Sequence, residues 1–74
     1  MNKERRIQIV KVADNLSLQK ADLSYLREKE EEYRDNLPEN LSESDWYTQS
    51  DEKIDKLDEI IRILNDVISD LNEL

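Results

Sequence analysis

The sequence predicts an all-α fold in which two long helices pack as an antiparallel coiled-coil hairpin. Three observations support this prediction. Apolar residues recur at alternating spacings of three and four on both sides of the centre, and the single proline, Pro38, lies between the two stretches. The chain also has no glycine and 41% charged residues, a composition typical of long exposed helices. We expect one domain over residues 1–74, with a helix over about 4–36, a turn over 37–43 and a helix over about 44–73.

The first expected helix carries apolar residues on two faces. Because residues two apart on a helix point about 200° away from one another, a second apolar stripe lies nearly opposite the seam. The expected seam runs through Ile9, Val12, Leu16, Gln19, Leu23, Leu26, Glu30 and Tyr33. The second stripe consists of Ile7, Val10, Leu18, Ala21 and Tyr25.

The break between the helices follows from backbone chemistry. Pro38 disfavours the helical conformation for Leu37 and lacks the amide hydrogen that a helix interior uses, so the first helix should end by about Asn36. The segment 42–45, Ser-Glu-Ser-Asp, is rich in side-chain oxygens that accept hydrogen bonds from free amides at a helix start. A second helix is therefore expected to begin there.

The second expected helix has an unbroken seam and a wider apolar face than a minimal coiled coil. Seam positions whose numbers sum to about 80 should lie side by side in a hairpin, which would place Glu30 opposite Ser50 as a polar layer that fixes the register. The seam consists of Tyr47, Ser50, Ile54, Leu57, Ile61, Leu64, Ile68 and Leu71, and Trp46, Ile60, Val67 and Leu74 widen it.

A hairpin of this size needs further stabilisation. A single core below about 70–80 residues rarely supplies more than roughly 3–5 kcal/mol, and the absence of cysteine and histidine excludes a disulfide and the usual zinc sites. Oligomerisation remains, so we expect a homodimer that forms a four-helix bundle. The expected self-interface consists of Ile7, Val10, Leu18, Ala21, Ile60, Val67 and Leu74.

The net charge of −8 arises almost wholly from the second helix. Its outer face carries carboxylates that we call the acidic ridge. One interpretation is that they keep the protein soluble and interact favourably with the helix dipole. The alternatives are that they bind a basic protein surface by imitating DNA phosphates, or that they bind cations. Direct nucleic-acid binding is disfavoured, because negative charge opposes phosphate attraction. The acidic ridge consists of Glu52, Asp55, Glu59, Asp66, Asp70 and Glu73.

Three of the four aromatic residues surround the expected tip of the hairpin. These residues, Tyr33, Trp46 and Tyr47, either close the open end of a thin core or anchor a binding partner, a role in which tryptophan and tyrosine are over-represented.

Catalysis and cofactor binding are not expected. The chain lacks histidine and cysteine, which are common general bases and nucleophiles, and it has no glycine-rich loop for a phosphate. The inward Glu-x-x-His motifs of di-iron bundles cannot exist without histidine. No apolar run reaches the 18 residues needed to cross a bilayer, and no signal-peptide core is present, so we expect no membrane association.

The stretch Glu31-Glu32-Tyr33-Arg34-Asp35-Asn36-Leu37-Pro38-Glu39-Asn40-Leu41-Ser42-Glu43-Ser44 resembles the turn of short helical-hairpin proteins found in phages, prophages and bacterial genomes. These proteins share a Tyr-x-x-x-hydrophobic-Pro-Glu-Asn-Leu turn and a second helix with Ile-Asp and Leu-Glu pairs. The similar downstream segment here is Ile54-Asp55-Lys56-Leu57-Asp58-Glu59-Ile60. The resemblance implies a helical hairpin in a phage or mobile-element setting, and it implies no catalytic activity.

Together these observations predict a non-enzymatic acidic protein-binding module of the bacterial cytoplasm. Its expected action is to inhibit a host protein, such as a defence or nucleic-acid-processing complex. The alternative is a structural self-assembly element without inhibitory activity. A third hypothesis, a nucleotide or small-ligand sponge at the dimer interface, has no cluster of convergent basic residues to mark its pocket.

Overall fold

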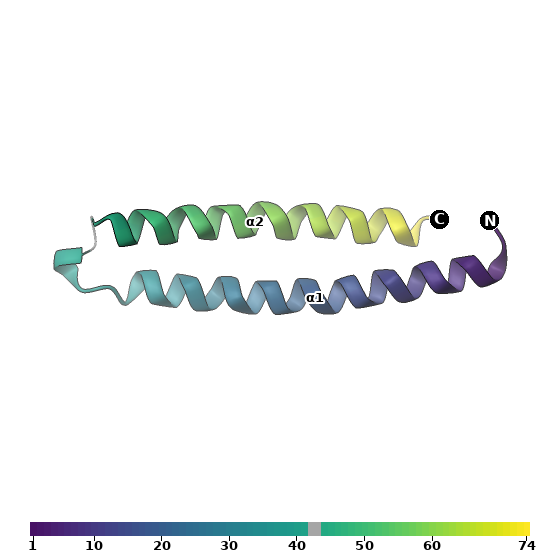
Figure 1. Ribbon diagram of the computed structural model, residues 1–74, viewed down its shortest axis with the longest axis horizontal. Helices are drawn as coiled ribbons and strands as arrows, with labels where there is room; N and C mark the ends of the chain where they lie inside the picture. Colours follow the sequence, from purple (N-terminus) through teal and green to yellow (C-terminus); the bar gives the residue numbers. More distant parts are fainter. Residues whose placement is uncertain (42–43) are drawn as a thin grey trace.

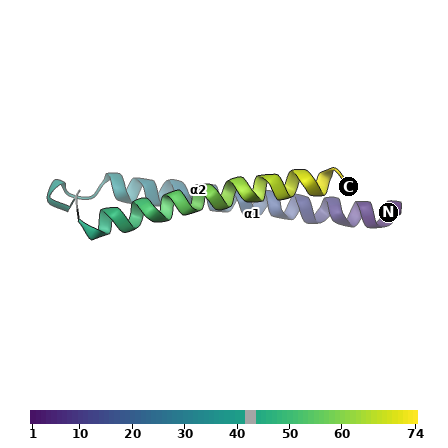
Figure 2. The ribbon, with the colours of Figure 1, turned by 90° about the horizontal axis from the view of Figure 1, so that it is seen from above.

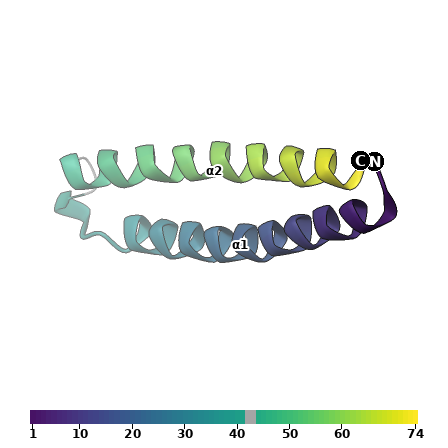
Figure 3. The ribbon, with the colours of Figure 1, turned by 45° about the vertical axis from the view of Figure 1, so that its right-hand side comes forward.

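The computed structural model describes residues 1–41 and 44–74, and it confirms the expected antiparallel hairpin. Helix α1 spans Lys3–Asp35, a short 3-10 helix η1 spans Glu39–Leu41, and helix α2 spans Asp45–Asn72. Figures 1 and 3 show α1 and α2 side by side with both termini at one end, and Figure 2 shows that the two helices cross at a shallow angle. The Cα atoms extend over 60 × 14 × 11 Å. Neither helix, within these described residues, is long and apolar enough to span a membrane.

The ends of α1 are set by local hydrogen bonds and by the proline. The Asn2 side chain accepts a hydrogen bond from the Arg5 amide at 2.8 Å, which caps the start of the helix. The last residue of the helix is Asp35, and Leu37 and Pro38 follow shortly after. Because proline cannot continue a helix and restricts the residue before it, the chain turns at this point.

The start of α2 is capped by a serine, as the sequence indicates. The Ser44 hydroxyl accepts a hydrogen bond from the Tyr47 amide at 3.4 Å and donates one to the carbonyl of Leu41. The other residues of the expected cap and turn, Ser42 and Glu43, lie outside the described residues.

The seam of α2 is the one that the sequence predicts. All eight of its positions are buried or half-buried against α1, and Ile54 is 2% exposed. Ser50 is also buried, and its hydroxyl donates a hydrogen bond to the Glu30 backbone carbonyl at 3.5 Å. This contact places Ser50 opposite Glu30, so the predicted register is correct at that layer.

The seam of α1 differs from the expected one at every second position. Its shared positions, Ile9, Leu16, Leu23 and Glu30, are half-buried. At the intervening positions the next residue along the chain faces α2, which rotates the contact line around α1. The buried or half-buried residues there are Ala13, Lys20, Arg27 and Arg34, whereas Val12, Gln19, Leu26 and Tyr33 are exposed.

Replacement of Ile54 by alanine tests the seam of α2. Because Ile54 is almost fully buried, Ile54→Ala should lower the free energy of unfolding by about 2–5 kcal/mol. The matched control is Ile63→Ala on the same helix, where the side chain is 46% exposed and the change should stay within about 1 kcal/mol. Urea denaturation followed by circular dichroism at one fixed protein concentration measures both values. Equal losses in the two variants would contradict this seam.

Candidate protein-binding surfaces

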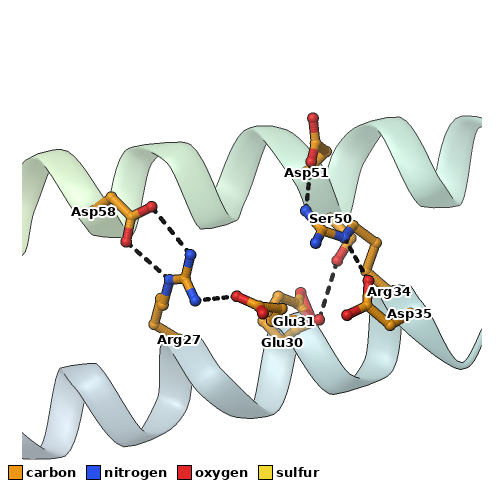
Figure 4. A network of polar contacts seen from close by, with 8 residues as sticks. All are labelled: Arg27, Glu30, Glu31, Arg34, Asp35, Ser50, Asp51 and Asp58. Carbon is orange, nitrogen blue, oxygen red and sulfur yellow. Dashed lines mark hydrogen bonds and ion pairs between the residues drawn. The ribbon is translucent and has the colours of Figure 1, made fainter.

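Three polar contacts cross between the helices at intervals of seven residues. We call them the polar ladder, and in each pair the residue numbers add up to 85. Figure 4 shows the second and third rungs, in which arginines of α1 reach carboxylates of α2. The pairs are Lys20–Asn65 at 3.0 Å, Arg27–Asp58 at 2.8 Å and Arg34–Asp51 at 2.6 Å. The ladder was not predicted from the sequence, although the sequence carries its signal, a set of basic residues on one helix matched by acceptors at the same spacing on the other.

The two arginines of the ladder combine apolar packing with charge pairing. A hydrogen bond to Asp58 is the main cause that raises the pKa of Arg27 above its ordinary value, and Arg27 also pairs with Glu31 one turn further along α1. The pKa of Arg34 is raised by hydrogen bonds to Asp35 and Asp51. Both guanidinium groups therefore remain charged, and the side chains of Arg27 and Arg34 are only 28% and 20% exposed.

The ladder accompanies the rotation of α1 away from its expected orientation. Bringing Lys20, Arg27 and Arg34 to the contact line moves Val12, Leu26 and Tyr33 to its flank. Full burial of one such apolar side chain contributes about 1.5–3 kcal/mol, and ion pairs exposed to solvent contribute much less. A lone hairpin would therefore gain from the opposite rotation. This orientation is favourable when another surface covers the flank.

The flank belongs to a surface that we call the apolar face, built from one stripe on each helix. Its apolar side chains are 37–57% exposed, and each stripe has a spacing of seven or fourteen residues, which keeps it on one side of its helix. The α1 stripe holds Val12, Leu26 and Tyr33, with Gln19 between them, and the α2 stripe holds Trp46, Ile60, Val67 and Leu74, with Lys53 between them.

Both stripes lie on the same side of the hairpin. Tyr33 from α1 and Trp46 and Lys53 from α2 line one shallow hollow of about 250 Å³. Since residues seven apart differ by only about 20° around a helix, the rest of each stripe continues from this hollow along the molecule. The apolar face is therefore a strip beside the seam, interrupted by Gln19 on α1 and by Lys53 on α2.

The structure divides the expected self-interface between two sides of the hairpin. Ile60, Val67 and Leu74 belong to the apolar face. The remaining members lie on the back and opposite side of α1: Leu18 is 65% exposed, two residues beyond the seam residue Leu16 and about 200° from it. Ile7 and Val10 instead line an open hollow with Lys3, Arg6 and Lys11, and Ala21 is also exposed.

The aromatic tip also separates into two environments. Tyr33 and Trp46 are exposed and share the hollow at the end of the apolar face. Tyr47 is half-buried on the seam, with the Arg34 guanidinium carbon 5.7 Å from its ring centre. This distance fits a cation–π contact, so Tyr47 helps to close the core, and the other two aromatics remain available to a partner.

The acidic ridge is exposed and lies on the other side of α2 from the apolar face. We measure angles around α2 from Ile54, which faces α1. The six members of the acidic ridge lie about 100–160° from Ile54 in one direction, and Ile60 and Val67 lie about 120–140° from it in the other. Glu59 pairs with Lys56 at 3.3 Å and Asp66 with Arg62 at 3.7 Å. Within the described part of the chain the other members form no ion pair: Glu52, Asp55, Asp70 and Glu73.

The fold and these surfaces define the class of protein, an all-α helical hairpin with an apolar face and an acidic ridge. Across residues 1–41 and 44–74, no group of three or more acidic side chains is placed to hold a metal ion. No protein-family model, curated protein or solved structure matches the chain.

Exchange of charges across the ladder tests its role in holding the helices together. Arg27→Asp and Asp58→Arg should each lower the melting temperature by several degrees, because each places like charges together. The double variant should recover most of the loss. The control exchange is Lys56 with Glu59, a pair within α2 that should leave the melting temperature nearly unchanged in all three combinations. Additive losses at the Arg27–Asp58 pair would show that the two groups do not interact.

Proposed function

We propose that this chain is a non-enzymatic protein-binding module. The observation that carries the proposal is the apolar face, where seven large apolar side chains are exposed along one side of a very thin core. Exposed apolar strips of this extent are a mark of protein interaction surfaces. Trp46 and Tyr33 at one end of the face are residue types that often anchor such interfaces.

A narrower proposal concerns the acidic ridge and a basic partner. The ridge is exposed, four of its carboxylates are unpaired within the described residues, and it lies apart from the apolar face. A line of carboxylates attracts the basic surfaces with which nucleic-acid-processing proteins bind phosphates. With the phage or mobile-element setting that the turn resemblance implies, this supports an inhibitor of a defence or nucleic-acid-processing complex in the bacterial host cytoplasm.

The second candidate function is a structural self-assembly element. Its support is that both stripes of the apolar face repeat with the same period of seven as the seam, which is the pattern of helices packed in bundles. Such an element would need the apolar face alone, and the acidic ridge would serve solubility. The two functions therefore differ in whether the ridge contacts a partner.

Neutralisation of the ridge tests the inhibitor. The variant carries Glu52→Gln, Asp55→Asn, Glu59→Gln and Asp66→Asn, and DNA binding by a panel of purified bacterial defence and DNA-processing proteins is measured by fluorescence anisotropy. The wild-type protein should displace DNA from at least one panel member. The variant should need at least about tenfold more protein for the same displacement, because its complementary charges are removed.

The control variant neutralises the same number of carboxylates on α1: Asp14→Asn, Asp22→Asn, Glu28→Gln and Glu32→Gln. It changes the net charge as much as the ridge variant does, so a general charge effect would weaken both equally. Displacement that only the ridge variant loses supports the inhibitor. If the wild-type protein displaces no DNA, or if both variants behave like it, the ridge is not an inhibitory surface and the self-assembly element is favoured.

A further inference from the structure

We propose that the apolar face is covered by a second copy of this chain, so that two hairpins pack face to face as a four-helix bundle through Val12, Leu26, Tyr33, Trp46, Ile60 and Val67. The inference rests on the proposed function, because it assigns an occupant to the face that carries it. On α1, the proposed self-interface differs from the one expected from the sequence. It uses residues beside the seam, and it leaves out residues on the outer side of the helix such as Leu18.

The spacing of the face matches a second copy. Its two stripes are aligned in four levels, each with one residue from either helix and numbers that add up to 79, and Leu74 lies beyond the last level. Every level includes at least one apolar residue. A two-fold rotation presents the same two stripes, at the same spacing and length, to the first copy, which is how isologous interfaces form. The levels are Tyr33 with Trp46, Leu26 with Lys53, Gln19 with Ile60, and Val12 with Val67.

The extent of the face fits a stable dimer. From Val12 to Tyr33 the stripe is about 32 Å long at 1.5 Å per residue, and two adjacent helices are about 20 Å wide. This footprint is similar to the roughly 800 Å² that each partner buries in a standard interface. A second copy would therefore cover the six exposed apolar side chains of the four levels at once.

The charge distribution permits two acidic chains to meet at this face. Lys53 is the one charged residue among the eight positions of the four levels. The carboxylates of the acidic ridge lie on the other side of α2, so two copies can join without opposing their ridges across the interface. The net charge of −8 then remains on the outside of the bundle, where it keeps the assembly soluble.

The test compares Ile60→Asp with Leu18→Asp. Both introduce one carboxylate at an exposed apolar position of the single hairpin, where Ile60 is 37% and Leu18 65% exposed, but only Ile60 lies on the apolar face. Light scattering over a concentration series should give the wild type and Leu18→Asp twice the chain mass of 8.9 kDa. Ile60→Asp should weaken the dimer at least about 100-fold, because it buries an unpaired charge at the interface.

Trp46 gives an independent readout on the unmodified chain, so the test does not depend on the folding of a variant. Its side chain is 57% exposed in the single hairpin. Dilution of the wild type should shift its fluorescence to longer wavelength as the mass falls to that of one chain. A wild type that stays monomeric, or a dimer in which Trp46 remains open to an iodide quencher, would overturn the inference.

A dimer broken by Leu18→Asp and not by Ile60→Asp would also overturn it, because the interface would then lie on the outer side of α1. These failures are distinct from failure of the proposed function. A monomer that still displaces DNA in the ridge experiment would remain a protein-binding module whose apolar face has a different occupant.

Discussion

Helices α1 and α2 contact each other along one line. The residues of α1 on this contact line are buried or half-buried, and this choice determines which other residues of α1 are left on its exposed surfaces. The polar ladder occupies one edge of the line, with Arg27 and Arg34 spanning from α1 to Asp58 and Asp51. These long side chains fill the seam with their stems and satisfy their charges at its edge. Ala13, which is 1% exposed, is buried on the same line in the half of α1 nearer the termini.

The cost of this arrangement is apolar exposure on the neighbouring side. Ala13, Ile54 and Ile68 are the apolar residues buried within the described part of the chain, a very small core for two helices of this length. Hydrophobic burial scales with the area removed from water, so most of the available stabilisation lies in surfaces that the single hairpin leaves open. Under the proposed function, stability and partner binding would be linked, because the same side chains would serve both.

The separation of the two surfaces has consequences for function. The acidic ridge and the apolar face occupy separate flanks of α2, centred about 100° apart around the helix, so they share no residue. Self-association through the apolar face would present two acidic ridges on one assembly, and two linked binding surfaces bind a suitably spaced partner more tightly than one. The inhibitor and the assembly element are thus compatible arrangements of the same chain, and the ridge is what distinguishes them.

The sequence by itself determined the two helices, the break at Pro38, a capping segment at 42–45 and the whole seam of α2. These features depend on local backbone chemistry or on an apolar pattern with one clear face, so neighbouring residues are enough to specify them. The seam of α1 was different, because Val12, Leu26 and Tyr33 compete with Ala13, Arg27 and Arg34 for the same contact line. By hydropathy the first set is favoured, and only the tertiary structure showed that the second set occupies the contact line, where Arg27 and Arg34 meet acceptors on α2. The α1 stripe of the apolar face follows from this arrangement. Its residues Val12, Leu26 and Tyr33 are assigned to the core by the local pattern, but they are exposed because other residues of α1 face α2.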